Sequence, residues 1–165
     1  MRLYRICPEK YLENYTGLGA SYQDGARWNK PGQSVLYFAA SAATALLEMA
    51  NYLPSPRLIP KSYRLGIYEL DENASIRVYP DNKLPDDWAR FPYPGSTQQI
   101  GGDWLEQDGE FGLLVPSSAV PQGLEKIMVV NPLHPDITFL KLVSSTAELF
   151  NKRTFSGLDN IANSK

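Results

Sequence analysis

Apolar and polar residues alternate in several short runs along this 165-residue chain, each short enough for a single strand. The pattern predicts strands at residues 3–7, 35–39, 63–70, 75–78, 111–115, 127–130 and 138–142. We expect 75–78 to be the hairpin partner of 63–70, because only the polar stretch 71–73 and one alanine lie between them.

Two segments have the periodicity of a helix. Ser41 is a suitable N-cap for a helix over residues 42–53. One apolar stripe is expected on it, made of Ala43, Leu46, Leu47, Ala50 and Leu53. A second helix is expected over residues 97–106, although two adjacent glycines lower its helix propensity.

The connections between these elements are unequal in length. Residues 13–34 are rich in glycine and polar groups and are expected to form a long ordered loop, and residues 80–96 a proline-rich connection with a helical turn near 86–90. Strands and helices do not alternate regularly, so a doubly wound parallel sheet is disfavoured. The pattern favours one α+β domain over residues 1–155, followed by a polar tail at 156–165.

Composition excludes several classes of function. The formal net charge is −2, whereas a nucleic-acid binder usually carries a basic excess, so direct DNA or RNA binding is not expected. Cys7 and His134 are the only cysteine and histidine, which rules out an internal disulfide and zinc sites built on those ligands. The longest apolar stretch, 35–50, is too short and too polar for a membrane span, and no signal-peptide core is present. We therefore expect a cytoplasmic protein.

Arg27 lies in a glycine-flanked loop, residues 25–32. Glycines give such a loop backbone freedom, and the guanidinium group can bind phosphate or ribose oxygens through two parallel hydrogen bonds. The alternative is a turn whose arginine is simply solvated. The loop residues alone favour the alternative.

Glu48 is the one charged residue of the helix predicted at 42–53, and Tyr37 lies on the strand before it. Burying an unpaired carboxylate is costly, so a buried glutamate here would indicate a functional site. Glu48 also lies about 100° from Leu47 around the helix, which lets it reach water at the edge of the apolar stripe. Spacing slightly favours the solvated position.

Ser117 and Ser118 follow the strand predicted at 111–115, where hydroxyl groups commonly close turns. A serine hydrolase is weakly supported, because His134 lies in a turn-like run and the G-x-S-x-G elbow is absent.

The order of several short segments resembles the RES domain family, which is named for an arginine, a glutamate and a serine. The segments are Tyr4-Arg5-Ile6, Gly25-Ala26-Arg27-Trp28-Asn29, Val35-Leu36-Tyr37-Phe38-Ala39, Ala45-Leu46-Leu47-Glu48, Val115-Pro116-Ser117 and Asn131-Pro132-Leu133-His134-Pro135-Asp136. Ala26 departs from the family pattern, which commonly has a second glycine there, and residues 122–127 lack an asparagine often seen in the family. By this match the residues naming the family fall on Arg27, Glu48 and Ser117.

The resemblance implies an ADP-ribosyltransferase-like fold, with a mixed, mostly antiparallel split sheet flanked by short helices. Family members are typically toxins of bacterial toxin–antitoxin systems, paired with a helix-turn-helix antitoxin of the Xre type. Relatives degrade NAD⁺ by hydrolysis or phosphorolysis, and ADP-ribosylation of a protein has also been attributed to the family. The resemblance thus implies growth inhibition by an NAD⁺ glycohydrolase or NAD⁺ phosphorylase. A mono-ADP-ribosyltransferase and a non-catalytic regulatory partner of the antitoxin are the alternatives.

The resemblance also assigns roles to the matching residues. Glu48 would offset the positive charge that develops on the ribose, and Ser117 would hold Glu48 or the ribose. Arg27 and Arg5 would bind the pyrophosphate and ribose, and Tyr37 would stack on the nicotinamide ring. NAD⁺ is then a substrate, inorganic phosphate is a candidate co-substrate, and no cofactor or metal is expected. An antitoxin that covers the cleft, and a homodimer within that complex, are the expected partners.

Overall fold

Seven strands form one mixed sheet in the computed structural model, which describes residues 1–53, 58–151 and 154. They are β1 (Arg2–Pro8), β2 (Leu36–Ala39), β3 (Tyr63–Leu70), β4 (Ile76–Val78), β5 (Gly112–Pro116), β6 (Lys126–Val130) and β7 (Leu140–Thr146). Their order across the sheet is β4-β5-β6-β2-β1-β3-β7, and every neighbouring pair is antiparallel except the parallel pair β4 and β5. The expected α+β class with a mostly antiparallel sheet is confirmed.

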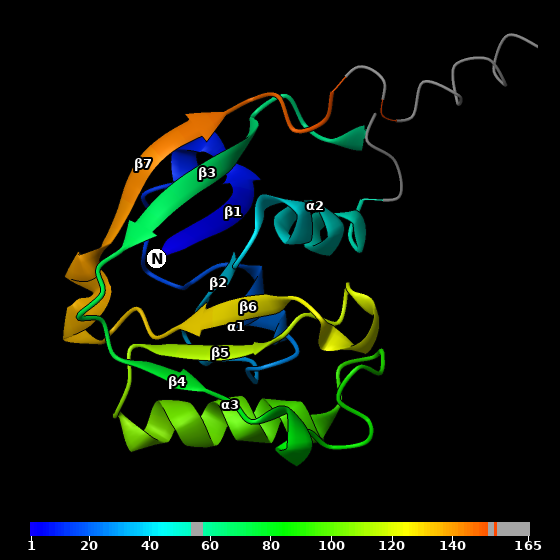
Figure 1. Cartoon of the computed structure of the whole chain (residues 1–165), viewed down its shortest axis with the longest axis vertical. Helices are drawn as coiled ribbons and strands as arrows, with labels where there is room; N and C mark the ends of the chain where they lie inside the picture. Colours follow the sequence, from blue (N-terminus) through cyan, green and yellow to red (C-terminus); the bar gives the residue numbers. More distant parts are fainter. Residues whose placement is uncertain (54–57, 152–153, 155–165) are drawn as a thin grey trace, which may run out of the picture.

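The sheet is almost divided between β1 and β2, which pair at a single position, Tyr4 with Ala39. One half contains β7, β3 and β1, the other contains β2, β6, β5 and β4, and the halves meet at a steep angle in Figure 1. A buried cluster joins them, with Tyr68 from the first half packed near Phe38 from the second. The split sheet is therefore held together more by side-chain packing than by hydrogen bonds across the β1–β2 junction.

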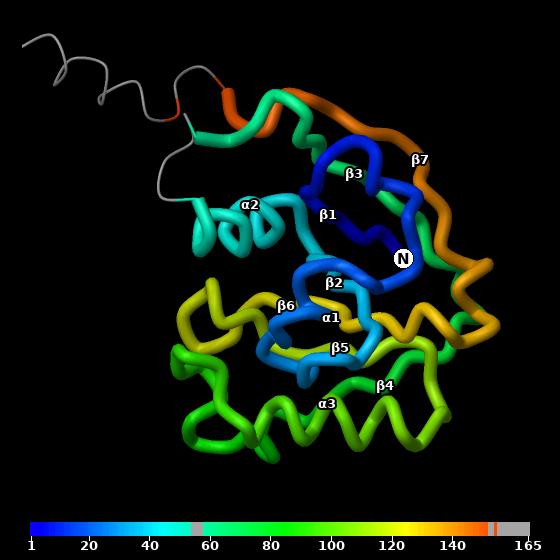
Figure 2. The backbone as a smooth tube through the Cα atoms, turned by 180° about the vertical axis from the view of Figure 1, so that it is seen from behind, coloured from blue at the N-terminus to red at the C-terminus, as the bar shows by residue number. Residues whose placement is uncertain are grey.

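The helices are short apart from one. They are α1 (Ala20–Asp24), α2 (Ala42–Ala50) and α3 (Gly95–Gln107), with 3-10 turns η1 (Glu9–Tyr11), η3 (Asp81–Lys83), η4 (Pro121–Gly123) and η5 (Pro135–Phe139). Figure 2 shows the connection from β1 to β2, including α1, crossing over the strands of the second half. None of the helices described is both long and apolar enough to cross a membrane.

Several predicted elements are confirmed with small shifts. The second predicted helix, 97–106, is present as α3, and the turn near residues 86–90 is closed by backbone hydrogen bonds from Trp88 to Pro85 and from Arg90 to Asp87. The loop expected at 13–34 contains α1, and the strand expected at 138–142 begins only at Leu140, after η5. The predicted tail, 156–165, lies outside the described residues.

The hairpin predicted between 63–70 and 75–78 is wrong. β3 pairs with β1 and β7, whereas β4 lies at the opposite edge of the sheet, beside β5. The link between β3 and β4 is held away from a hairpin turn, because the carboxylate of Asp136 accepts hydrogen bonds from the backbone N–H and the hydroxyl of Ser75 (2.9 and 2.8 Å). The strand predicted at 75–78 is thus present as β4, but its neighbour in the sheet is β5 rather than β3.

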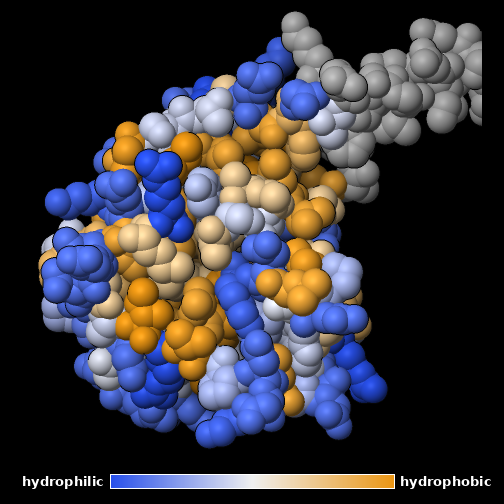
Figure 3. Space-filling model, viewed as in Figure 1, coloured by the Kyte–Doolittle hydropathy of each residue, from blue (hydrophilic) through white to orange (hydrophobic). Residues whose placement is uncertain are grey.

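The apolar stripe predicted on the first helix is also wrong. Ser41 caps α2 as expected, accepting a hydrogen bond from the Thr44 backbone N–H. The buried residues, however, are Thr44 and Ala45, the helix ends at Ala50, and Leu47 is 47% exposed. The helix turns a partly polar side inward, because Thr44 and Glu48 have hydrogen-bond partners, Glu125 and Ser117, in the connection between β5 and β6. On the face seen in Figure 1, exposed apolar side chains are common, in groups separated by polar ones (Figure 3).

Candidate active site

The loop that carries Arg27 is fixed from inside by Asn29, which is fully buried. Its amide nitrogen donates to the backbone oxygens of Ser21, Lys30 and Gln33 at 2.7, 3.1 and 3.3 Å. Ala26, the departure from the family pattern, does not have a positive φ, so its side chain is tolerated. The loop is therefore an ordered support rather than a flexible turn.

Arg27 itself is only 8% exposed, so the solvated alternative considered from sequence is wrong. Its Nη1 donates to the backbone oxygens of Trp88 and Arg90, the latter at 2.9 Å. Its guanidinium carbon lies 5.3 Å from the centre of the Tyr93 ring. Burial lowers the pKa of Arg27, and nearby groups including Glu48 partly offset that effect. An arginine remains charged under these conditions, so the site contains a buried, oriented cation.

Tyr37 is held by its hydroxyl group at the edge of this loop. The hydroxyl donates to Oδ1 of Asn29 (2.8 Å) and accepts from the backbone N–H of Trp28 (3.2 Å). Burial raises the pKa of Tyr37, which keeps the hydroxyl protonated and able to donate. The orientation of the ring is thus set by the same loop that positions Arg27.

Glu48 extends from α2 toward the end of β5, where the Ser117 hydroxyl donates to its Oε1 at 2.6 Å. Ser117 is fully buried, and its backbone N–H donates to the oxygen of Glu125 (2.8 Å). The Ser117 Oγ also accepts from the backbone N–H of Ala119 (3.2 Å), so it closes a turn as well. The structure therefore places Glu48 in a paired, half-buried position rather than at a fully solvated edge.

The elements that carry these groups lie on one side of the molecule. In Figure 1, α2, the yellow segment around η4 and the green connection between β4 and α3 all reach the right-hand side. Contacts connect the residues on these elements. Ser117 is bonded to Glu48 of α2, and the Tyr37 hydroxyl is bonded to the backbone of Trp28, next to Arg27. Arg27 lies over the Tyr93 ring, whose hydroxyl is bonded to Tyr52 just after α2.

Arg5 is not brought to this group. Along β1, Leu3 and Cys7 pack in the cluster shared by the two sheet halves, and the Arg5 guanidinium carbon lies 5.8 Å from the Phe38 ring of that cluster. Tyr37 belongs to the other cluster. Successive residues of a strand point to opposite faces, which explains the separation.

His134 also lies apart, and its Nδ1 accepts a hydrogen bond from the backbone N–H of Asp136 (3.1 Å) at the start of η5. The hydroxyl of Ser117 is bonded to Glu48, so no serine–histidine pair is formed. In the part of the chain described, no group of three histidine, cysteine or acidic residues is placed to hold a metal.

Sequence reasoning missed the aromatic wall of the site. The hydroxyl groups of Tyr52, just after α2, and Tyr93, in the proline-rich connection, lie 2.7 Å apart. Tyr93 also covers Arg27. A usable signal was present in the sequence, because Trp88, Phe91 and Tyr93 concentrate aromatic residues in a connection that is otherwise polar and rich in proline.

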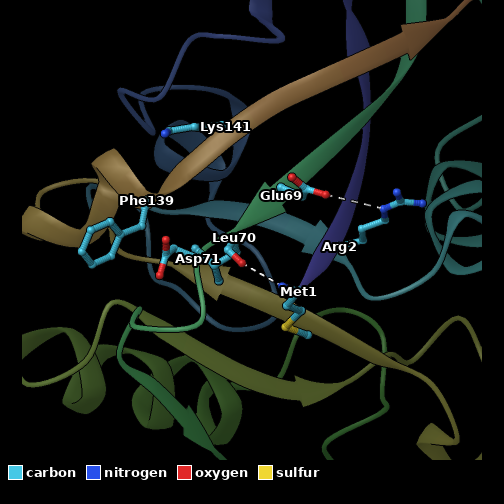
Figure 4. A pocket seen from close by; sticks show the side chains of 7 residues that line it. All are labelled: Met1, Arg2, Glu69, Leu70, Asp71, Phe139 and Lys141. Carbon is cyan, nitrogen blue, oxygen red and sulfur yellow. Dashed lines mark hydrogen bonds and ion pairs between the residues drawn. The ribbon is translucent and has the colours of Figure 1, made fainter.

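A separate hollow of about 390 Å³ lies where β1 and β7 begin and β3 ends. Its lining residues include Arg2, Glu69 and Lys141. Figure 4 shows Arg2 facing Glu69 and the amino group of Met1 bonded to the Leu70 oxygen (2.7 Å). None of the matched family residues lines it. We therefore place the candidate site at Glu48 and Arg27.

Comparisons with known proteins identify the family of this chain. Residues 2–150 match the family described as RES domain. The chain is 34% identical over 155 residues to "Toxin Res" of Yersinia enterocolitica serotype O:8 / biotype 1B, covering 93% of this chain and 99% of that one. It is 33% identical over 142 residues to "Prs ADP-ribosylating toxin" of Sphingobium sp. (strain YBL2), covering 86% of each.

A solved structure supports the fold. A chain in the crystal structure of the M. tuberculosis MbcT–MbcA toxin–antitoxin complex superposes with a TM-score of 0.69 at 20% identity, over 88% of this chain and 82% of that one. The family match over residues 2–150 and the relatives that are 33–34% identical over most of the chain lead to one conclusion: this chain belongs to the RES domain family.

Proposed function

We propose that this protein is a toxin that destroys NAD⁺ by breaking its nicotinamide–ribose bond. The observation that carries the proposal is the 2.6 Å hydrogen bond from Ser117 to Glu48, in a site that also contains the buried cation of Arg27. An oriented carboxylate and an oriented guanidinium match the two charged regions of the substrate, a developing ribose cation and a pyrophosphate. Family membership supports the same conclusion.

The reaction needs no acid for its leaving group. The bond between ribose C1″ and the pyridinium nitrogen breaks, its electron pair passes to that nitrogen, and nicotinamide leaves as a neutral molecule. Positive charge develops on C1″, where the carboxylate of Glu48 would offset it. Water then forms the new C1″–O bond and releases a proton, giving ADP-ribose. Inorganic phosphate in the same place would give the 1″-phosphorylated product.

The hydrogen bonds within the site support a separate role for each residue. Ser117 donates to Glu48 and would keep that carboxylate aimed at the ribose. Nη1 of Arg27 is occupied by Trp88 and Arg90, so its remaining N–H groups would bind the pyrophosphate. Tyr37 would present its ring to nicotinamide, because its hydroxyl is already bonded. We assign no substrate contact to Arg5, because it lies beside Phe38 in the cluster shared by the two sheet halves.

Product analysis tests the proposal. Purified protein free of any antitoxin is incubated with NAD⁺, with and without phosphate, beside a Glu48→Ala variant. Nicotinamide released by the wild type and not by the variant supports cleavage through this site, and the second product identifies the nucleophile. Intact NAD⁺ in all samples would contradict free turnover.

A second candidate is mono-ADP-ribosylation of a protein, favoured by the relative named Prs ADP-ribosylating toxin. The same site would pass C1″ to a protein side chain instead of water or phosphate. NAD⁺ labelled in its adenosine part distinguishes the two reactions in a cell lysate. Transfer places the label on a protein band, whereas hydrolysis or phosphorolysis leaves it on small molecules.

A toxin that acts on NAD⁺ also requires an inhibitor in its own cell. We expect a cytoplasmic complex with an Xre-type helix-turn-helix antitoxin that covers the site, within which this chain can form a homodimer. The solved chain similar in fold was crystallised with an antitoxin. Expression without antitoxin should stop growth, and expression of Glu48→Ala should not. Normal growth with the wild type would favour a non-catalytic regulatory partner.

A further inference from the structure

The helix that carries Glu48 has little apolar packing to fix its direction. α2 has nine residues, and only Thr44 and Ala45 are buried, whereas Leu46 is half-buried and Leu47 is exposed. A helix this short depends on tertiary contacts for its stability, because its own hydrogen bonds are too few. Polar contacts therefore contribute strongly to the rotation of α2 about its axis.

Two polar side chains on one side of α2 have partners in the short connection between β5 and β6. Glu48 accepts from the Ser117 hydroxyl at 2.6 Å, and Thr44 donates its hydroxyl to Oε2 of Glu125 at 3.3 Å. Thr44 and Glu48 are four residues apart, so they lie one turn apart on the same side of the helix. Their partners are joined as well, because the backbone N–H of Ser117 donates to the oxygen of Glu125 (2.8 Å). The four residues thus form a closed ring of contacts.

The hydroxyl of Thr44 is committed to Glu125 by the hydrogen bonds around it. Oγ of Ser41 accepts from the backbone N–H of Thr44 (3.1 Å), and the two hydroxyl oxygens lie 2.8 Å apart. Each hydroxyl has a single O–H, and an ionised carboxylate can only accept, so Thr44 donates to Glu125 and Ser41 donates to Thr44. Thr44 is only 1% exposed, which shields its hydroxyl from water. The N-cap of α2 and the carboxylate of Glu125 therefore belong to one chain of hydrogen bonds.

A single tie would leave α2 free to turn about the bond between Glu48 and Ser117, whereas two ties one turn apart fix both its tilt and its rotation. We propose that Glu125 is a positioning residue, which acts through Thr44 to set the direction from which Glu48 approaches the ribose, an inference that rests on the proposed function. Glu125 needs no contact with the substrate for this role. Because it acts by accepting a hydrogen bond, a neutral side chain with an oxygen in the same place can largely replace it.

The test compares Glu125→Ala, Glu125→Gln and Glu106→Ala with NAD⁺ as substrate. Glutamine keeps a side-chain oxygen that can accept from Thr44, whereas alanine has none. Glu106 is an exposed glutamate of α3 without a role in the site, so its removal is a matched control for the loss of one surface charge. We expect Glu125→Ala to lower kcat about fivefold and to leave KM within about twofold of the wild type, because a displaced carboxylate offsets less charge in the transition state. Glu125→Gln should recover most of that loss, and Glu106→Ala should have no effect.

Thr44→Val removes the hydroxyl while keeping the shape of the side chain. If Glu125 acts through Thr44, the double variant with Glu125→Ala should lose no more kcat than the more affected single variant. Additive losses would mean that the two residues act separately and would overturn the proposal. It is also overturned if Glu125→Gln is as slow as Glu125→Ala, because the charge of Glu125 rather than its hydrogen bond would then matter.

Amide hydrogen exchange over residues 42–50 provides a readout that does not depend on turnover. Glu125→Ala should speed exchange in α2 about threefold or more, and Glu125→Gln and Glu106→Ala should not. Unchanged exchange in Glu125→Ala overturns the proposal whether or not the protein cleaves NAD⁺, and faster exchange with an unchanged kcat overturns it too. If the wild type leaves NAD⁺ intact, the proposed function fails and the catalytic part of the inference fails with it, while faster exchange would still support the tie between Glu125 and α2.

Discussion

The hydroxyl of Ser117 donates to Oε1 of Glu48 across 2.6 Å, joining residues that are 69 positions apart in the chain. The bond is short, as expected when the acceptor is an ionised carboxylate. Because Ser117 is fully buried and its backbone is fixed to Glu125, this hydroxyl sets the direction in which the Glu48 charge points. In this chain Ser117 is thus a hydrogen-bond partner of Glu48.

Replacing Glu48 by glutamine tests the charge while keeping the shape. The amide still accepts a hydrogen bond from Ser117, so the fold should remain, but it no longer offsets positive charge on the ribose. We expect kcat for NAD⁺ to fall about 100-fold or more. Single-turnover measurements check this, and a rate equal to that of the wild type would remove Glu48 from the mechanism.

Replacing Ser117 by alanine tests the orientation of that charge. Glu48 would keep its ionised carboxylate but lose a charge-assisted hydrogen bond of about 1.5–3 kcal/mol. We expect kcat to fall about tenfold or more with a smaller change in KM, because the loss affects the transition state more than substrate binding. Ser118→Ala is the control, since the neighbouring serine has no assigned role in the site. Equal effects of the two substitutions would indicate that only the local turn matters.

Arg27→Lys keeps the charge and loses the planar fork. A lysine ammonium cannot hold the Trp88 and Arg90 oxygens and present further donors to a pyrophosphate at the same time. We therefore expect weaker binding of ADP-ribose, by about tenfold, in calorimetric titration. Wild-type affinity in the variant would mean that Arg27 acts only as a support for residues 88–93.

Tyr37→Phe separates the ring from the hydroxyl. Without the hydroxyl, Oδ1 of the buried Asn29 loses its partner, which should lower the free energy of unfolding by about 1–3 kcal/mol. Urea denaturation measures this change, with Tyr11→Phe at an exposed tyrosine as control. If the ring is what contacts nicotinamide, the folded variant should keep most of its turnover. Full stability together with loss of turnover would instead assign the hydroxyl to catalysis.

Local sequence patterns predicted the fold where neighbouring residues decide it. The strand at 63–70 and the Ser41 cap were correct because alternation and capping are local properties. The hairpin partner of β3 was wrong, since pairing depends on residues far along the chain, including Asp136 with Ser75.

The candidate site shows the same limit. The resemblance identified Arg27, Glu48 and Ser117, and the structure groups them. The spacing on the helix favoured a solvated Glu48, whereas the structure pairs its carboxylate with Ser117. Helix spacing cannot predict this partner, because Ser117 lies 69 residues further along the chain. The aromatic residues at positions 88–93 are visible in the sequence, but their contact with Tyr52 is not, because the Tyr52–Tyr93 hydrogen bond joins two connections whose paths are set by tertiary packing.

Two glycines of α3, Gly101 within the helix and Gly95 at its start, differ in the space around them. A Cβ atom at Gly101 would lie 1.7 Å from the backbone oxygen of Trp28, whereas one at Gly95 would have nothing within 4 Å. We expect Gly101→Ala to destabilise the protein by several kcal/mol, about the upper range for point substitutions, and Gly95→Ala to stay within about 1 kcal/mol of the wild type. Thermal unfolding of both variants measures the difference.

Helix propensity predicts the opposite result, because alanine favours a helix at both positions. The backbone clash should dominate, since Trp28 is fully buried and its carbonyl cannot move without moving the loop. Arg27 precedes Trp28, so any Gly101→Ala protein that still folds should also bind ADP-ribose more weakly than Gly95→Ala does. Equal stability of the two variants would contradict the close packing of α3 on this loop, and with it the support that positions Arg27.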